Sequence, residues 1–445
     1  MEERDHFGSK IGFILAAAGS AIGLGAIWMF PYMAGTNGGS VFVILFIVCT
    51  ILIGLPILLA EFIIGRKGQA DPVSGFKKLA PGKPWFLIGW SGFIFSFIIL
   101  SFYSVVGGWI LSYLIRAITF SLNGTSETFY EDLFNTVISN PLEVLIGQGV
   151  FIFLTIWIVS GGIKSGIEKT SKWMMPLLLI FFVVLAIRSL TLEGAMEGIK
   201  FLFVPDWSYL NWKTALVALG QTFFSLSVGV SAMITYASYL PKETKLGSSA
   251  LSVSLLNIGI SIMAGLVIFP AVFALGFSPD SGPGLVFIIL PAVFKQILFG
   301  QFFLILFFIL LLLATLTSSI SMLEIVVSIG IKSKYDRRKR AAWVYGIYIF
   351  IVGIPSALSF GVLSNIHILS MSIFDFADFI TSSFGLPLGA LFISLFAGYV
   401  LSKSELSKEL KLNTFLLHAW HIIVRYAAPV AIIIVFVQGI IKVFF

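Results

Sequence analysis

The chain has 445 residues, of which 58% are hydrophobic and 11% are charged, with a mean hydropathy of +1.04. This composition excludes a water-soluble globular protein. The net charge of +7 does not indicate a nucleic-acid partner, because the basic residues lie in short segments between apolar runs. One membrane domain over residues 1–445 is expected, since helices satisfy their own backbone hydrogen bonds in lipid.

Eleven apolar runs are long enough to cross a bilayer, which takes roughly 17–25 residues per helix. In chain order they are 11–33, 40–65, 86–118, 143–160, 171–190, 214–240, 249–276, 301–330, 341–360, 371–400 and 424–444. They predict an all-α integral membrane protein with two five-helix halves, 11–190 and 214–400, and an eleventh helix at 424–444.

The segments between these runs predict the orientation of the chain. Lysine and arginine collect at 66–83, 164–172, 242–245 and 332–340, whereas 119–142 and 278–294 are poorly basic. By the positive-inside rule the amino terminus is cytoplasmic, and with eleven spans the carboxyl terminus is extracellular. Prolines and glycines at 279–284 indicate an extracellular re-entrant lid.

Two runs contain clusters of small residues near their centres. Residues 19–25 read GSAIGLG and residues 225–231 read SLSVGVS. Glycine costs a helix about 1 kcal/mol relative to alanine, and serine competes for backbone hydrogen bonds, so both segments favour unwinding. Close helix packing explains either cluster alone. Interrupted helices at matching positions of two halves, however, indicate the binding site of a secondary transporter.

Further motifs surround the two clusters. They are AAGSAIGLG at 17–25, FPY at 30–32, NGG at 37–39, Glu61, GQTFFSLS at 220–227, YASY at 236–239 and LTSS at 316–319. In this order, over nearly the whole chain, they resemble the neurotransmitter:sodium symporter family of the LeuT type. The resemblance implies a LeuT-like 5+5 inverted repeat with helices 1 and 6 unwound at mid-membrane. It also implies a bacterial eleven-helix member in the plasma membrane.

The resemblance implies a second sodium site made of three backbone carbonyls and two hydroxyls. Its ligands would come from Gly19, Ile22, Ala314, Thr317 and Ser318. Carbonyls freed by unwinding and hydroxyl groups are hard oxygen ligands suited to a small cation. The alternative is that the Thr317 and Ser318 hydroxyls bond back to the preceding turn of their own helix.

The first sodium site of the family is incomplete in this sequence. It would use Ala21, Ser225, Asn257 and the carboxylate of a bound substrate, but Ala26 stands where the family often has asparagine. Chloride is not expected, because Phe46 replaces the tyrosine of the anion site in chloride-dependent relatives. We therefore expect firm sodium binding only at the second site.

The resemblance also implies a substrate site between the unwound segments, where an exposed helix end favours a carboxylate. The positions implied for the carboxylate and ammonium groups are Ala21, Leu24, Gly25, Tyr103, Phe224 and Ser225. Those implied for the side-chain pocket are Ile99, Phe224, Ser227, Val230, Ser318 and Met322. The absence of charge in this set predicts a small neutral, hydrophobic amino acid.

Both gates depart from the family pattern. At the outer gate Met29 replaces the usual cationic partner of Asp378, so that salt bridge cannot form. At the inner gate Arg4 and Tyr239 match the family, and Asp336 is the available substitute for a missing acidic partner.

Three further features lie inside apolar runs. Glu61 and Glu324 are carboxylates that need partners in lipid, and the resemblance places Glu61 near the amides of the unwound segments. Gly166 and Pro176 match a family feature of helix 5, where a proline removes a helix hydrogen bond and permits unwinding.

These expectations predict sodium-coupled symport of a small neutral amino acid by alternating access. An enzyme would need a nucleophile, an acid–base pair or a metal cluster inside the bundle, and none is evident. A channel would need polar rings along a pore. The alternative function, a membrane sensor that binds the amino acid with little transport, is not excluded by the sequence, because both gates are atypical. The expected partners are the amino acid, sodium and the lipid bilayer.

Overall fold

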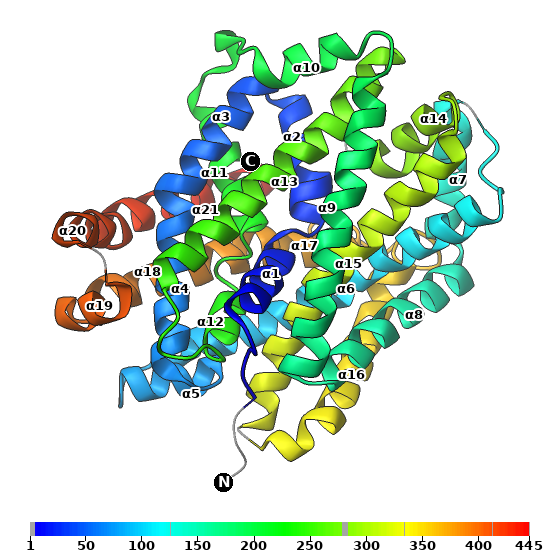
Figure 1. Cartoon of the computed structure of the whole chain (residues 1–445). Coiled ribbons are helices and arrows are strands. Elements are labelled where there is room, and N and C mark those ends of the chain that lie inside the picture. The colour runs from blue at the N-terminus through cyan, green and yellow to red at the C-terminus, as the bar shows by residue number, and fades with distance from the viewer. Residues whose placement is uncertain (1–4, 125, 278–283, 333, 412, 445) are drawn as a thin grey trace.

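The computed structural model describes residues 5–124, 126–277, 284–332, 334–411 and 413–444, and this part of the chain is built of helices and their connections (Figure 1). Arg4 lies outside the described residues, and so do residues 278–283 of the predicted extracellular lid. The predictions for these two segments are therefore not tested by the structure.

Nine helices in the described residues are long and apolar enough to cross a membrane. They are α3–η2–α4 (Ser40–Cys49, Thr50–Gly54, Leu55–Gly68), α6 (Phe86–Ile118), α8 (Pro141–Ser160), η3–α9 (Ile163–Glu168, Lys169–Leu190), α13 (Leu246–Ala274), α15 (Gly300–Ile331), α16 (Arg338–Leu358), α17–η7–α18 (Ile373–Asp378, Phe379–Gly385, Leu386–Tyr399) and α20–η8–α21 (Thr414–Ile422, Ile423–Ala427, Ala428–Phe444). Each overlaps a predicted span, but η3–α9 begins at Ile163 and not at residue 171, and α20–η8–α21 begins at Thr414 and not at residue 424. The η segments among them are π-helical.

The first and sixth predicted spans are broken. In the first, α1 (Lys10–Ala21) is followed by η1 (Gly25–Met29) and α2 (Phe30–Thr36), with a bend of 55° at the break. In the sixth, α11 (Trp212–Ser225) and α12 (Ala232–Ala237) are separated by the non-helical residues 226–231. The prediction of two helices interrupted at matching positions is confirmed.

Backbone conformation ends the helix at both breaks. Ile22, which follows α1, has a φ of −93° and a ψ of 71°, outside the helical region, and a Cβ on the next residue, Gly23, would lie only 2.3 Å from the Oγ of Ser318. Ser227, Gly229 and Ser231 have φ angles of 53°, 98° and 65°. These left-handed conformations end a right-handed helix, and glycine adopts them most readily.

Short helices that the sequence analysis treats as loops connect the spans. They are α5 (Pro72–Leu79), α7 (Glu127–Ser139), α10 (Ala195–Phe203), η4 (Trp207–Tyr209), η5 (Leu285–Ile289), α14 (Leu290–Lys295), η6 (Tyr335–Arg337) and α19 (Lys403–Leu410). In Figure 1, α7, α10 and α14 lie toward one end of the bundle, and α5 lies at the opposite end with the amino terminus.

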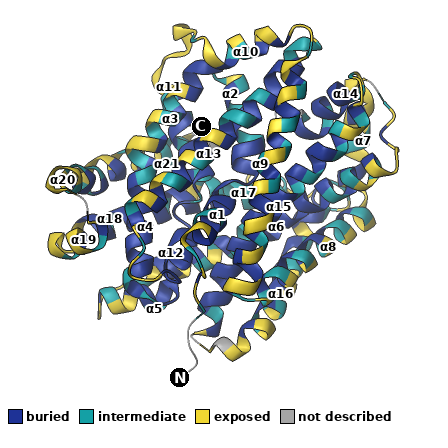
Figure 2. Cartoon of the chain, in the orientation of Figure 1, coloured by how far each residue is buried: buried dark blue, intermediate teal, exposed yellow. Residues whose placement is uncertain are grey.

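The broken helix α1 and the long helix α15 lie at the centre of the bundle. α15 packs against α1, α6, α8, α9 and α16. Figure 2 shows that exposed residues gather on outer helices such as α8, α16 and α20, whereas the central helices are mostly buried. Exposed apolar residues on these outer helices, such as Trp157 and Ile422, face the hydrocarbon of the bilayer.

Ion pairs fasten connecting elements to span ends. Arg66, at the end of α4, is 4% exposed and pairs with Glu409 of α19 at 2.6 Å, while it also donates to the carbonyl of Thr244. Lys67 pairs with Glu405 of the same helix and lowers the pKa of that carboxyl to about 2. The loop after α12 and helix α19 are thus held on one span.

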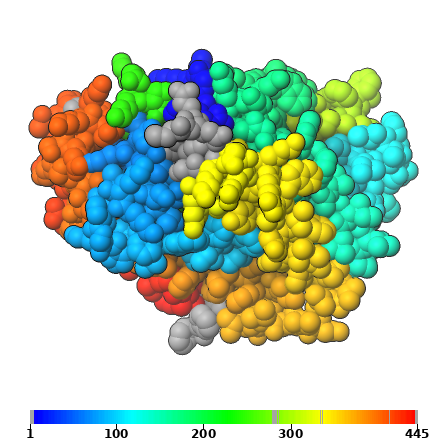
Figure 3. Space-filling model, turned by 90° about the horizontal axis from the view of Figure 1, so that it is seen from below, coloured from blue at the N-terminus to red at the C-terminus, as the bar shows by residue number. Residues whose placement is uncertain are grey.

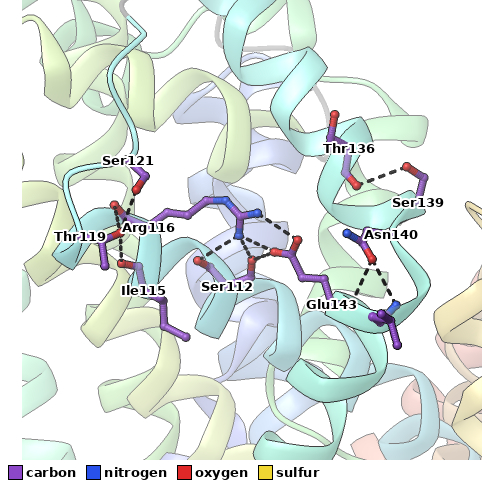
Figure 4. Close-up of polar contacts among 10 residues, drawn as sticks. Ser112, Ile115, Arg116, Thr119, Ser121, Thr136, Ser139, Asn140 and Glu143 are labelled. Atoms are coloured by element: carbon purple, nitrogen blue, oxygen red, sulfur yellow. Dashed lines mark hydrogen bonds and ion pairs between the residues drawn. The ribbon is translucent and has the colours of Figure 1, made fainter.

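A second polar cluster joins α6 to α8 (Figure 4). The Arg116 guanidinium donates to the Glu143 carboxylate and to the Ser112 hydroxyl. The side chain of Asn140 caps α8 by accepting from the backbone amides of Leu142 and Glu143. These contacts satisfy charged groups that lie half-buried at the ends of two spans.

Candidate functional site

A cavity of about 70 Å³ lies between the two helix breaks, α6, α15 and η7. The predicted substrate residues that line it are Ala21, Leu24, Gly25, Ile99, Tyr103, Phe224, Ser227, Val230, Ser318 and Met322. Ser225 does not line it. Among the described residues of its wall none is charged, so the cavity suits a neutral or zwitterionic molecule with an apolar side chain.

The same wall contains residues that the sequence analysis missed. They are Ser20, Gly23, Phe102, Ala232, Ser321, Ser382 and Leu386. The Ser20 hydroxyl donates to the Ser321 hydroxyl at 2.7 Å, and Ser227 donates to the Ser20 carbonyl at 3.0 Å. Ser20 could have been predicted from the sequence, because it lies in the segment predicted to unwind, where backbone carbonyls lose their helical partners.

The carboxylate end of the predicted site is built from the start of η1. The backbone amide of Leu24 donates to the Tyr103 hydroxyl at 3.4 Å, and η1 begins at the next residue. A Cβ on Gly25 would lie 2.8 Å from the Phe224 ring, which closes one side of the cavity. Amides at a helix start and a phenol hydroxyl are suitable donors to an anionic group.

The residues of the predicted second sodium site lie together at the break of the first span. The Ser318 hydroxyl donates to the carbonyls of Gly19 at 3.3 Å and Ser20 at 3.1 Å. The Thr317 hydroxyl bonds back to the Ala314 carbonyl at 2.9 Å. A donating hydroxyl keeps its oxygen lone pairs, so these bonds are compatible with ligation of a cation. Ile22, the remaining predicted ligand, is buried in the break itself.

The residues of the predicted first sodium site are also brought together, but they bond to one another. The Ser225 hydroxyl donates to the Asn257 side-chain oxygen at 2.9 Å. The Asn257 amide nitrogen donates to the carbonyls of Ser225 at 3.0 Å and Ala21 at 3.3 Å. Ala26 is buried and adds no side-chain oxygen. The Ala21 and Ser225 carbonyls each keep a lone pair beside the bond from this amide, so the group that a cation would lack here is a side-chain oxygen at position 26.

Glu61 stabilises the break of the sixth span. Its side chain is fully buried, and its carboxylate accepts a hydrogen bond from the backbone amide of Gly229 at 2.7 Å. The amide is available because Gly229 lies in the non-helical segment. The prediction that Glu61 accepts from amides freed by unwinding is confirmed.

A second cavity of about 310 Å³, the aromatic vestibule, lies beside the central cavity and shares Leu24, Phe102, Tyr103 and Phe224 with it. Aromatic rings form much of its wall, among them Trp28, Tyr32, Phe102, Trp109, Phe134, Phe360 and Phe374. The Trp109 ring stacks on Phe374 with centroids 5.5 Å apart. The wall of this vestibule is therefore largely aromatic.

Asp378 and Met29 both line this vestibule. The Asp378 carboxylate accepts from the Ser382 hydroxyl at 2.7 Å, and no ion pair among the described residues includes it. The neighbouring Asp375 accepts from the hydroxyl of Ser372, the N-cap residue of α17. That the outer gate of this protein works without a salt bridge stays a prediction.

A buried network joins α15, α16 and the segment after α12, and it includes Tyr239, which was predicted at the inner gate, and an ion pair that was not predicted. Glu324 of α15 is fully buried and pairs with Arg338 at the start of α16. The Tyr239 hydroxyl donates to the same carboxylate at 2.7 Å, and the Tyr239 carbonyl accepts from the amide of Phe7. Asp336, the substitute proposed from sequence, is exposed and lines a different cavity, and its pairing with Arg4 is not tested because Arg4 lies outside the described residues.

The two helix 5 residues lie in helical structure. Gly166 belongs to the π-helical segment η3, where a Cβ would lie 2.2 Å from the carbonyl oxygen of Ile158. Pro176 lies inside the continuous helix α9. The unwinding expected between them is not present in this structure and stays a prediction about another conformation.

Comparisons with known proteins agree along the whole chain. A family model described as the sodium:neurotransmitter symporter family matches residues 4–136 and 126–444. YhdH of Bacillus subtilis, described as an uncharacterised sodium-dependent transporter, is 50% identical over 434 residues, which cover 97% of this chain and 96% of that protein. An uncharacterised sodium-dependent transporter of Haemophilus influenzae is 37% identical over 453 residues and 98% of each chain.

Among solved structures, that of MhsT in complex with L-phenylalanine matches with a TM-score of 0.91 and 47% sequence identity. The match covers 98% of this chain and 100% of MhsT. The two broken helices around an uncharged cavity therefore belong to a LeuT fold, and the protein is a sodium-dependent transporter, not an enzyme. The chain belongs to the sodium:neurotransmitter symporter family.

Proposed function

We propose that this protein couples the uptake of a small hydrophobic amino acid to sodium by alternating access. The observation that carries the proposal is the uncharged cavity between the two helix breaks, which is lined mainly by apolar atoms. Helix ends beside it offer amides to a carboxylate and carbonyls to an ammonium group. Phenylalanine is the ligand of MhsT, which is 47% identical to this chain.

The ion would bind where the break of the first span meets α15. Thr317 and Ser318 supply hydroxyl oxygens, and Gly19, Ile22 and Ala314 supply carbonyls. Because Ser318 belongs both to this group and to the wall of the cavity, a cation here would fix the wall that the substrate contacts. This shared residue gives a physical basis for coupling between sodium and substrate.

Alternating access would open the cavity to one side at a time. The aromatic vestibule leads to it from the outer side, and the contacts among Tyr239, Glu324 and Arg338 close the inner side. We propose a cytoplasmic amino terminus and an extracellular carboxyl terminus in a bacterial plasma membrane, from the basic segments of the sequence.

The test is counterflow in proteoliposomes loaded with unlabelled phenylalanine, leucine or alanine. Radiolabelled amino acid outside should accumulate transiently when sodium is present, and it should not do so when choline replaces sodium. Sodium-dependent binding without counterflow would instead support a sensor that binds its ligand with little transport. A lack of both would exclude the proposed substrate class.

A further inference from the structure

A large basic pocket lies at the junction of α15 and α16, away from the substrate cavity. Its volume is about 700 Å³, and its wall includes Lys332, Lys334, Arg337 and Arg340, with Asp336 as the acidic residue among the described lining. All five side chains are exposed. In Figure 3 the yellow surface of this junction lies on the face seen from below, which is the end of the bundle where the chain begins.

The fold gives these cations a different environment from that of their neighbour Arg338. Arg338 is 6% exposed and forms an ion pair with the buried Glu324, so its positive charge is balanced inside the bundle. The side chains of Arg337 and Arg340 instead face outward, into or beside the pocket. Several exposed like charges around one concave surface raise its affinity for an anion.

The wall of the pocket continues into an apolar stripe on α16. Val344 lines the pocket and is 40% exposed, and Ile347, Tyr348 and Ile351 are 49%, 57% and 51% exposed. Together with Arg340 these residues recur at helical spacing along one face. Because α16 is long and apolar enough to cross the membrane, this face contacts acyl chains.

We propose that the pocket binds the headgroup of an anionic phospholipid, with an acyl chain of the same molecule along the α16 stripe. The positive-inside rule accounts for basic residues in this loop. It does not account for their convergence on one cavity whose wall leads directly to a lipid-facing stripe. That combination matches both parts of an amphiphile, whereas a free phosphate would use the basic part alone.

The position of the site connects it to the inner closure. The pocket residues Arg337 and Arg340 flank Arg338, which holds α16 to Glu324 on α15. A headgroup that contacts Lys332 after α15 and Arg340 of α16 would therefore join the same two helices as the buried pair.

The test uses the full-length protein in a neutral detergent, with thermal unfolding followed against added short-chain phosphatidylglycerol. A saturable rise in melting temperature is expected. Phosphatidylcholine of the same chain length and inorganic phosphate should produce little rise. The pocket variant Lys332→Gln/Lys334→Gln/Arg340→Gln should bind weakly, because each cation near an anionic surface strengthens binding about fivefold, or on the order of a hundredfold for three.

A matched control removes the same number of exposed cations elsewhere. Lys83→Gln/Lys164→Gln/Lys169→Gln lowers the net charge equally and leaves the pocket intact. It should respond to phosphatidylglycerol as the parent does. The proposal is overturned if both triple variants respond alike, or if phosphate or phosphatidylcholine stabilises the protein as strongly. Since the assay involves no transport, this outcome is independent of the proposed symport.

Discussion

The hydroxyl groups of Thr317 and Ser318 meet the broken first span where the proposed sodium ion would bind. We expect Thr317→Ala/Ser318→Ala to abolish sodium-dependent uptake, because two hard ligands are lost. Each hydroxyl contributes only about 0.5–1.5 kcal/mol of net hydrogen bonding to stability, so the fold should persist. Uptake in proteoliposomes and the melting temperature together measure the two effects.

The control for this pair lies on the same helix. Ser319 and Ser328 are also buried and bond to the carbonyls of Leu316 and Ile325, and neither lines the central cavity. Ser319→Ala/Ser328→Ala therefore removes two buried hydroxyls of the same helix without removing the proposed ligands. Sodium-driven uptake that survives in the first double variant, or is lost equally in the second, would contradict the assignment.

Val230 lines the cavity and is 3% exposed. We expect Val230→Trp to exclude leucine and phenylalanine while alanine or glycine, if bound by the parent, still competes. The reason is that a large ring would fill much of a cavity of about 70 Å³. Competition against a labelled substrate measures the change, with Val230→Ile as the conservative control. Unchanged competition by phenylalanine would show that this residue does not limit substrate size.

At the level of helices, Glu324 of α15 and Arg338 of α16 form a buried ion pair that joins the two helices. We expect Arg338→Met to leave an unpaired carboxylate, at a cost of about 3–5 kcal/mol. The inward-closed form should then lose stability, and a cysteine introduced at Phe7 should react faster with a membrane-impermeant thiol reagent.

The exposed neighbour Lys339, which does not line the basic pocket, provides the control for that prediction. Lys339→Met removes one positive charge one residue later and should leave the labelling rate near that of the parent. Equal acceleration in both variants would indicate a loss of surface charge as the cause. The native Cys49, which is partly buried, is replaced by alanine in all of these proteins.

Sequence patterns were sufficient to predict the membrane-spanning helices, but they could not predict every contact between the helices. The small residues at 19–25 and 225–231 predicted both breaks, because unwinding follows from local backbone preference. The partner of Glu324 could not be predicted, since Arg337, Arg338, Lys339 and Arg340 are adjacent residues of similar chemistry. Only the packed structure shows which of them turns inward. Ser225 illustrates the same limit, because its hydroxyl bonds to Asn257 rather than lining the cavity.

For the whole molecule, the incomplete first sodium site sets the expected stoichiometry. Ala26 supplies no side-chain oxygen to the first site, so only the second site should bind sodium firmly. Uptake should rise hyperbolically with sodium, with a Hill coefficient near one, and should persist when gluconate replaces chloride. A coefficient approaching two, or cation density between Ser225 and Asn257, would contradict this expectation.

The aromatic vestibule and the unpaired outer gate have a consequence for temperature. Without an ion pair between position 29 and Asp378, closure over a substrate depends on bringing apolar rings together, and burial of such surface carries a negative heat-capacity change. Apolar association also weakens on cooling. Calorimetry of substrate binding should therefore show an enthalpy that becomes more negative as temperature rises, and an affinity that falls in the cold. An enthalpy independent of temperature would contradict an apolar closure.

Met29→Arg would place a positive charge opposite Asp378. Substrate binding by this variant should become sensitive to ionic strength.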